Sequence, residues 1–137
     1  MVERIGISVE QELLKRFDGW MAAHGYTNRS EAVRDLMRST LLDEEWSAGK
    51  GEAAAVLILV YEHHFSDLAH RMSELQHHHN EIVVGAFHVH LDHDNCLEVV
   101  LLRGKSAEVK HFGEELTALR GIKYGKLIPA VTSSALK

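Results

Sequence analysis

The chain has 137 residues, 45% of them hydrophobic, and a formal net charge of −5. This length suits one ordinary domain or two very small ones. The acidic balance does not indicate nucleic-acid binding through global charge, and no apolar run approaches the roughly 20 residues that cross a bilayer. A single cysteine excludes an internal disulfide framework and fits a reducing cytosol. Because the N-terminus also lacks the pattern of a secretory signal, we expect a cytoplasmic protein without a membrane segment.

The first segment with a clear pattern is RIGISV at residues 4–9, in which apolar and polar residues alternate. Strict alternation is typical of a β-strand whose two faces have different environments. Arg4, Gly6 and Ser8 share the polar face. A strand this short needs a partner, and the residues that follow have helical spacing. We therefore predict that two chains pair these strands into an antiparallel ribbon.

Two helices are predicted after this strand. Helical spacing is carried in the first by Leu13, Leu14, Phe17, Trp20 and Met21, and Gly25 is a left-handed stop after it. Asn28 is the predicted N-cap of the second helix, with Glu31 three residues on as in a capping box. One strand and two helices in about 42 residues cannot enclose a core, which again favours a dimer.

The second half has its own repeating order of elements. A polar segment at 42–52 contains two glycines and predicts a linker, which we place at 46–52. Strand, helix, strand, strand, helix and strand are then expected at 53–63, 66–79, 82–91, 96–103, 106–119 and 122–128. This βαββαβ order is the ferredoxin-like pattern of ACT domains. The sequence therefore predicts an α+β fold with domains at 1–45 and 53–130 and a mobile tail at 131–137.

The segment GAFHVHLDHDNC holds the most distinctive candidate site. Residues two apart on a strand share a face, so His88 and His90 project together, opposite to Phe87 and Val89. A turn at 92–95 would bring Cys96, the chain's one thiol, back beside them. Two imidazoles and a thiolate, with a third histidine available from 77–79, suit a borderline-soft transition metal. The alternative is that the eleven histidines reflect composition alone.

The strand and the GYTNRSEAVRDLMR block resemble the ribbon-helix-helix family of DNA-binding repressors. With QHHH and HVHLDHDNCLEV in a βαββαβ half, almost the entire chain resembles the NikR family of nickel-responsive repressors. The resemblance implies a square-planar site with one Ni(II) per subunit. It also implies the ligands: His88, His90 and Cys96 from one subunit and His77 from a neighbouring one.

Further residues are assigned around this site and between the domains. Gln76 and Glu98 flank the ligands and are candidate partners for their ring N–H groups. Glu31 and Asp35 lie four residues apart on the second helix, and the resemblance suggests a cation site there between the two domains. Ordinary pairing with the arginines three residues further along is the alternative.

The resemblance also implies a DNA-binding surface. In that family the ribbon enters the major groove, so Arg4, Gly6 and Ser8 would face the bases. Gly6 departs from the pattern, because glycine has no side chain that reads a base edge. The N-terminus of the second helix is a candidate phosphate anchor, formed by Asn28, Arg29 and Ser30. The alternative is a ribbon that serves only to dimerise the chain.

The expected function is a homotetrameric transcriptional repressor, a dimer of dimers that nickel activates to bind double-stranded palindromic operator DNA, controlling nickel uptake. A cytosolic metal buffer or chaperone that uses its N-terminal strand only for dimerisation is the rival hypothesis. An enzyme with Cys96 as nucleophile and His88 or His90 as base is a weaker one, because no third orienting group or oxyanion site is evident.

Overall fold

The computed structural model describes residues 1–64 and 67–132. Contacts divide the chain into two compact units, the first Met1–Ser39 and the second beginning at Thr40. The first contains the helical segment and the second the βαββαβ order predicted from the sequence. Among the described residues, no helix combines the length and the apolar character needed to cross a membrane.

The first unit is built on helix α1 (Gln11–Ala23) and the first half of helix α2 (Arg29–Ala48). α1 ends before Gly25, whose φ of 79° is the predicted left-handed stop. Asn28 caps α2, since its Oδ1 accepts hydrogen bonds from the backbone N–H of Ser30 (2.7 Å) and of Glu31 (3.3 Å). Both predictions are confirmed.

Residues 1–10 carry neither helix nor strand in this single chain. Ile5 and Ile7, the apolar positions of the predicted strand, are 69% and 70% exposed. A β-strand exists through hydrogen bonds to a neighbouring strand, and a segment of this length has none within its own unit. The strand at 4–9 therefore stays a prediction that concerns a second chain.

Helix α2 extends further than the sequence predicted. Residues 42–48 lie in the polar segment from which the linker was predicted, but they continue the helix to Ala48. The segment contains no proline or glycine before Gly49, whose φ of 65° ends the helix. Trp46 also packs against the core of the second unit. Polarity here marks the solvent face of a helix and not a loop.

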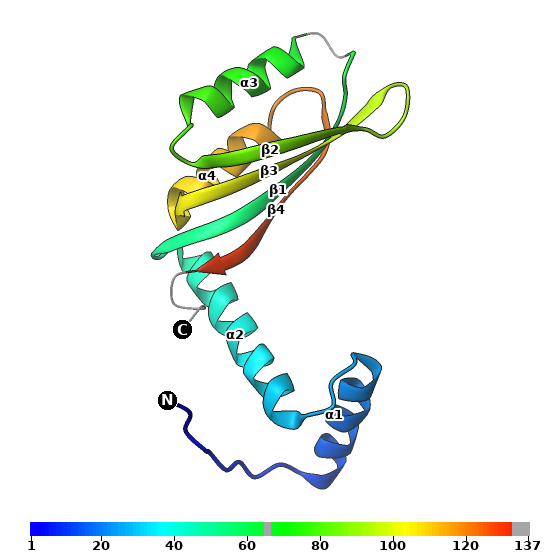
Figure 1. Cartoon of the computed structure of the whole chain (residues 1–137), viewed down its shortest axis with the longest axis vertical. Helices are drawn as coiled ribbons and strands as arrows, with labels where there is room; N and C mark the ends of the chain where they lie inside the picture. Colours follow the sequence, from blue (N-terminus) through cyan, green and yellow to red (C-terminus); the bar gives the residue numbers. More distant parts are fainter. Residues whose placement is uncertain (65–66, 133–137) are drawn as a thin grey trace. The chain divides into compact units, whose positions relative to one another are not determined.

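After the C-terminal part of α2, the described residues of the second unit form one four-stranded sheet with two further helices (Figure 1). Its elements are β1 (Glu52–Glu62), α3 (Leu68–His78), β2 (Val83–His90), β3 (Asn95–Lys105), α4 (Ser106–Thr117) and β4 (Ile122–Thr132). The strands lie in the order β2-β3-β1-β4, and every neighbouring pair is antiparallel. The order of elements confirms the predicted ferredoxin-like pattern.

One face of the sheet carries the core. Alternate residues of β1, including Leu57 and Leu59, are buried with Val100 and Leu102 of β3. The helices close this face with apolar side chains from α3 and α4, among them Leu68, Met72, Val109, Phe112 and Leu116. Cys96, on the same face at the end of the β2–β3 hairpin, belongs to this packed core.

The ends of two elements differ from their predicted bounds. β4 continues through Pro129, which pairs with Ala55, so residues 131–132 belong to the strand and not to a tail. Proline is compatible with this position because β4 is an edge strand, bonded on one side. The predicted start of α3 at residue 66 and the predicted tail at 133–137 lie outside the described residues.

Candidate metal centre

The β2–β3 hairpin brings the candidate ligands to one face of the sheet. His90 lies opposite Cys96 and His88 lies opposite Glu98 in the register of the two strands. The turn between the strands is the predicted one, closed by Asp92, whose Oδ1 accepts hydrogen bonds from the backbone N–H of Asp94 (2.9 Å) and Asn95 (2.8 Å). Hydrogen bonds from Asn95 and Asp94 lower the pKa of Asp92 to about 2.

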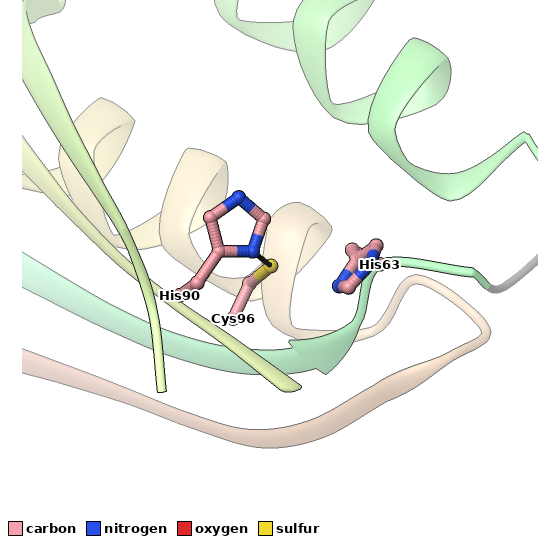
Figure 2. A group of neighbouring side chains, drawn as sticks. All are labelled: His63, His90 and Cys96. Atoms are coloured by element: carbon pink, nitrogen blue, oxygen red, sulfur yellow. Dashed lines mark hydrogen bonds between the residues drawn. The ribbon is translucent and has the colours of Figure 1, made fainter. Parts of the chain in front are cut away.

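His90 and Cys96 are in direct contact. The Nδ1 of His90 lies 3.6 Å from the Sγ of Cys96 (Figure 2). The Cys96 side chain is fully buried, and burial raises the pKa of its thiol, with Glu98 and Asp92 adding to the effect. The second imidazole of the predicted pair is adjacent, since the rings of His88 and His90 lie 5.2 Å apart. The predicted juxtaposition of imidazole and thiol is thus present in one chain.

A further donor comes from the end of β1. One ligand atom each of His63, His90 and Cys96 lies within 4.8 Å of the other two (Figure 2). The Nδ1 of His63 is buried and has no hydrogen-bond partner, which is the state of a donor atom that a metal ion would satisfy. Burial lowers the pKa of His63, as do the neighbouring His64, His90 and His93. The donors of this group therefore fit a transition-metal ion.

Sequence reasoning did not assign His63 to the site. Its position follows from the register of β1 on β3, in which Tyr61 lies opposite Cys96. The backbone N–H of His63 then donates a 3.0 Å hydrogen bond to the carbonyl of Asp94 in the hairpin turn. The contact depends on the pairing of two strands that are far apart in the sequence, and the local pattern of residues 53–63 does not predict it.

Two predicted ligands lie outside this three-residue group. His88 shares the face of His90 and stacks on Tyr61, with ring centroids 6.2 Å apart. His77 is exposed in the last turn of α3. The group formed within the chain therefore contains two of the four residues that the resemblance implied, together with His63.

The two residues predicted to orient the ligands bind each other. Gln76 Nε2 donates a 2.7 Å hydrogen bond to Glu98 Oε2, and the Tyr61 hydroxyl donates one of 3.3 Å to Oε1. Gln76 immediately precedes His77 on α3, while Glu98 lies opposite His88 on the sheet. This bond ties the end of α3 to the strand that carries Cys96.

The acidic pair on α2 has local partners in the first unit. Asp35 accepts hydrogen bonds from the Tyr26 hydroxyl at 2.6 Å and from Arg38 at 3.3 Å. The Arg38 contact is the three-residue pairing weighed as an alternative to a cation site. The hydrogen bond to Asp35 raises the pKa of Tyr26. A cation held by Glu31 and Asp35 stays a prediction.

The predicted DNA-contacting residues fall into two groups. Arg29 donates two hydrogen bonds to the Asp18 carboxylate, from Nε at 3.0 Å and from an Nη at 2.8 Å. The backbone N–H of Ser30 already donates to the side-chain oxygen of Asn28. A phosphate at this helix end would have to compete with these internal partners. Residues 1–10 are all exposed, Arg4, Gly6 and Ser8 among them.

Comparison with known proteins identifies the family. The sequence model of the family described as the NikR C-terminal nickel-binding domain matches residues 54–130. A nickel-responsive regulator of Anaeromyxobacter dehalogenans is 50% identical over 139 residues, with 100% of both chains covered. One from Geobacter sulfurreducens is 46% identical over 133 residues, covering 97% of this chain and 96% of the relative.

The fold also has a solved counterpart. An uncharacterized protein from Thermotoga maritima superimposes with a TM-score of 0.52 at 15% identity, covering 58% of this chain and 99% of its own. That likeness concerns the fold alone. The match of the nickel-binding domain and the near full-length relatives show more: this chain belongs to the NikR family of nickel-responsive regulators.

Proposed function

We propose that this protein is a cytoplasmic, nickel-dependent transcriptional repressor. It binds palindromic double-stranded operator DNA when Ni(II) is bound and thereby controls nickel uptake. The observation that carries the proposal is the contact between the exposed His90, through its Nδ1, and the buried Sγ of Cys96, inside a domain that matches the nickel-binding family. The relatives named as nickel-responsive regulators support the effector.

The proposed site holds one Ni(II) per subunit. Its ligands are His88, His90 and Cys96 of one chain and His77 of the partner subunit. Thiolate and imidazole donors in a planar set suit Ni(II), whereas Zn(II) prefers a tetrahedron. The contact of His90 with Cys96, the adjacent ring of His88 and the exposure of His77 support this set.

His63 is the competing donor, because it approaches the same thiol from within the chain. The two arrangements make opposite predictions. If the site is shared, His77→Ala loses the planar nickel species and His63→Ala keeps it. Mixing His77→Ala with Cys96→Ala protein then restores some complete sites in hybrid oligomers. If subunit exchange is demonstrated without recovery, the ligands lie within one chain and the shared site is refuted.

A homotetramer, as a dimer of dimers, is supported by two exposed apolar surfaces. In the first unit Leu13, Leu36 and Met37 are exposed in addition to the apolar positions of the N-terminal segment. In the second unit the sheet face opposite the core exposes Phe87 and Leu101. Clusters of exposed apolar side chains are typical of protein interfaces. We assign the first to ribbon pairing and the second to association of the nickel-binding domains.

Two alternatives are disfavoured by physical arguments. A nucleophilic cysteine needs a lowered pKa, and the pKa of Cys96 is raised, so an enzyme using this thiol is not supported. A metal buffer would have no need of polar residues on the outer face of the proposed ribbon, where Arg4 and Ser8 would lie. Membership of the regulator family is a second reason to place the protein outside the enzymes.

The experiment that tests the function is a gel shift on the DNA upstream of the protein's own gene and of nickel-transport genes. The nickel-loaded protein is expected to form a salt-sensitive, sequence-specific complex with the DNA. The zinc-loaded protein and the metal-free protein are expected to bind the same DNA weakly. Stoichiometric nickel binding without any metal-dependent DNA complex would refute the repressor and favour the buffer.

A further inference from the structure

Helix α2 belongs to both compact units of the chain. It runs without interruption over 20 residues, while the division between the units falls after Ser39. Residues 34–41, about two turns of the helix, are all exposed in this single chain. Ala32 near its start is buried, and Trp46 near its end packs against the core of the second unit. Packing within the chain therefore holds α2 near its two ends and not in its middle.

The C-terminal end of α2 is held by two side chains of helix α4. The Nζ of Lys110 donates a 3.0 Å hydrogen bond to the carbonyl of Trp46 and lies 5.5 Å from the centre of the indole ring. The Oγ of Ser106, a fully buried residue, donates a 2.9 Å hydrogen bond to the carbonyl of Lys50. The backbone N–H of Ser106 donates another of 2.9 Å to the carbonyl of Gly51. These bonds tie the end of α2 and the turn after it to the start of α4.

Lys110 supplies a positive charge that the end of α2 lacks. The last carbonyls of a helix have no partners within it and carry a partial negative charge. The last turn of α2 contains no basic residue, and three acidic residues lie at 43–45. Negative side chains near a helix C-terminus are unfavourable. The half-buried Lys110 is therefore a cationic cap from a separate helix, and removal of its ammonium group should loosen the last turn of α2.

Helix α4 also contacts the end of α3, where the proposed ligand His77 lies. The ring of Phe112, fully buried on α4, has its centre 4.9 Å from that of His79, the C-cap residue of α3. Lys110 precedes Phe112 by two residues on the same helix. One helix thus contacts the end of α3 and the end of α2. A change at the end of α3 can therefore reach α2 through α4.

We propose that Trp46, Ser106 and Lys110 form a coupling contact, which fastens the last turns of α2 to the nickel-binding domain and so passes the metal state of that domain to the DNA-binding unit. This role rests on the nickel-dependent repression proposed above. A helix that is unsupported in its middle can transmit a change only if its end is held. Loss of the coupling contact would leave the metal ligands and the DNA-contacting residues in place, but the binding of nickel would no longer favour the binding of DNA.

The test compares the full-length wild type with Lys110→Met, which keeps an apolar stem beside Trp46 and removes the ammonium group. Gel shifts on the DNA upstream of the protein's own gene measure affinity with and without Ni(II), and the charge-transfer absorbance follows nickel binding. The gain in DNA affinity that nickel causes should fall by at least about 10-fold, with nickel binding to the DNA-free protein unchanged. By linkage, the DNA should also raise nickel affinity less in this variant. Ser106→Ala should act in the same direction, whereas Lys110→Arg, which keeps the cation, should retain most of the gain.

Hydrogen exchange measures the coupling contact itself, without DNA. Amides of residues 45–49 should exchange faster in Lys110→Met than in the wild type, while those of the sheet stay protected. Lys105→Met is the matched control, because it removes the same charge from an exposed position just before the same helix.

Three results would overturn the coupling contact: a wild-type nickel-dependent gain in Lys110→Met, unchanged amide exchange in that variant, or an equal loss of the gain in Lys105→Met. A wild type that binds this DNA equally with and without nickel would overturn the repressor, and the coupling with it. The wild-type gel shift therefore tests the function, and the comparison of the two lysine variants tests the contact.

Discussion

The hydrogen bond between Gln76 and Glu98 predicts a measurable link between α3 and β3, the strand that carries Cys96. Replacing Gln76 with leucine keeps much of the side-chain volume and removes the amide that donates to Glu98 at 2.7 Å. Glu98 would retain the weaker 3.3 Å bond from the Tyr61 hydroxyl. The carboxylate would then be half-buried with one protein donor instead of two.

The expected cost follows from the kind of bond that is lost. A hydrogen bond to a charged group contributes about 1.5–3 kcal/mol to stability. Because Gln76 and Glu98 are only partly buried, water replaces some of the loss, and the lower end applies. We expect Gln76→Leu to lower the free energy of unfolding of the metal-free protein by about 1.5 kcal/mol, roughly a tenfold change in the folded-to-unfolded ratio.

Urea unfolding followed by far-ultraviolet circular dichroism measures this change. Glu98→Gln is the matched control, because an amide can still accept a hydrogen bond from Gln76 and only the charge is lost. It should cost less than Gln76→Leu. A change in Gln76→Leu within about 0.5 kcal/mol of the wild type, the range of ordinary surface substitutions, would refute the argument. Nickel affinity should fall with stability, because Gln76 precedes the proposed ligand His77.

Three further predictions concern other parts of the molecule. Cys96→Ala should abolish the near-ultraviolet charge-transfer absorbance of nickel while circular dichroism stays native; an unchanged nickel spectrum would refute the site. Arg4→Ala should weaken operator binding by about 1–3 kcal/mol at one base pair per half-site in gel shifts, with nickel stoichiometry unchanged; wild-type affinity would mean that the ribbon does not read DNA. Arg29 lowers the pKa of Asp18, so their pairing should stabilise the first unit fully at pH values above 3.8, the ordinary pKa of the carboxyl group, and this stability should be lost as the pH falls through the lowered pKa. NMR titration of Asp18 in the Arg29→Ala variant should show its pKa returning toward 3.8, and an unchanged pKa would refute the pairing.

The elements that the sequence predicted well are those with a local signature. The period-two pattern of 82–91 and the Asp92 turn predicted the hairpin that places His90 opposite Cys96. Asn28 and Gly25 predicted the bounds of helices through capping chemistry, and both act as expected. In each case the residues that determine the structure lie within a few positions of one another.

The features that the sequence missed arise from pairing across long separations. His63 approaches the thiol because β1 lies beside β3, and Gln76 meets Glu98 because α3 packs over that face. Arg29, assigned to DNA from its position at a helix N-terminus, is bound to Asp18 of the preceding helix. Periodicity and capping patterns contain no information on such partners, which depend on how separate elements pack.

The single chain gives Gly6 no structural role, and this leads to a last prediction. A Cβ added at Gly6 would meet no atom within 4 Å, and its φ lies outside the left-handed region that favours glycine. The isolated chain thus gives no reason for glycine here. A ribbon inserted in the major groove would give one, because the backbone then approaches the base edges closely.

Gly6→Ala should therefore leave the thermal unfolding temperature of the metal-free protein unchanged or slightly raised, because alanine restricts the conformations of the unfolded chain more than glycine does. Operator affinity of the nickel-loaded protein should fall by about 1 kcal/mol in gel shifts, the lower end of a base contact. Ser8→Ala is the matched control on the same face: it removes a hydroxyl without adding bulk and tests side-chain contact alone. Unchanged operator affinity in Gly6→Ala would refute close approach of the backbone, and reduced stability would mean that ribbon pairing requires the glycine.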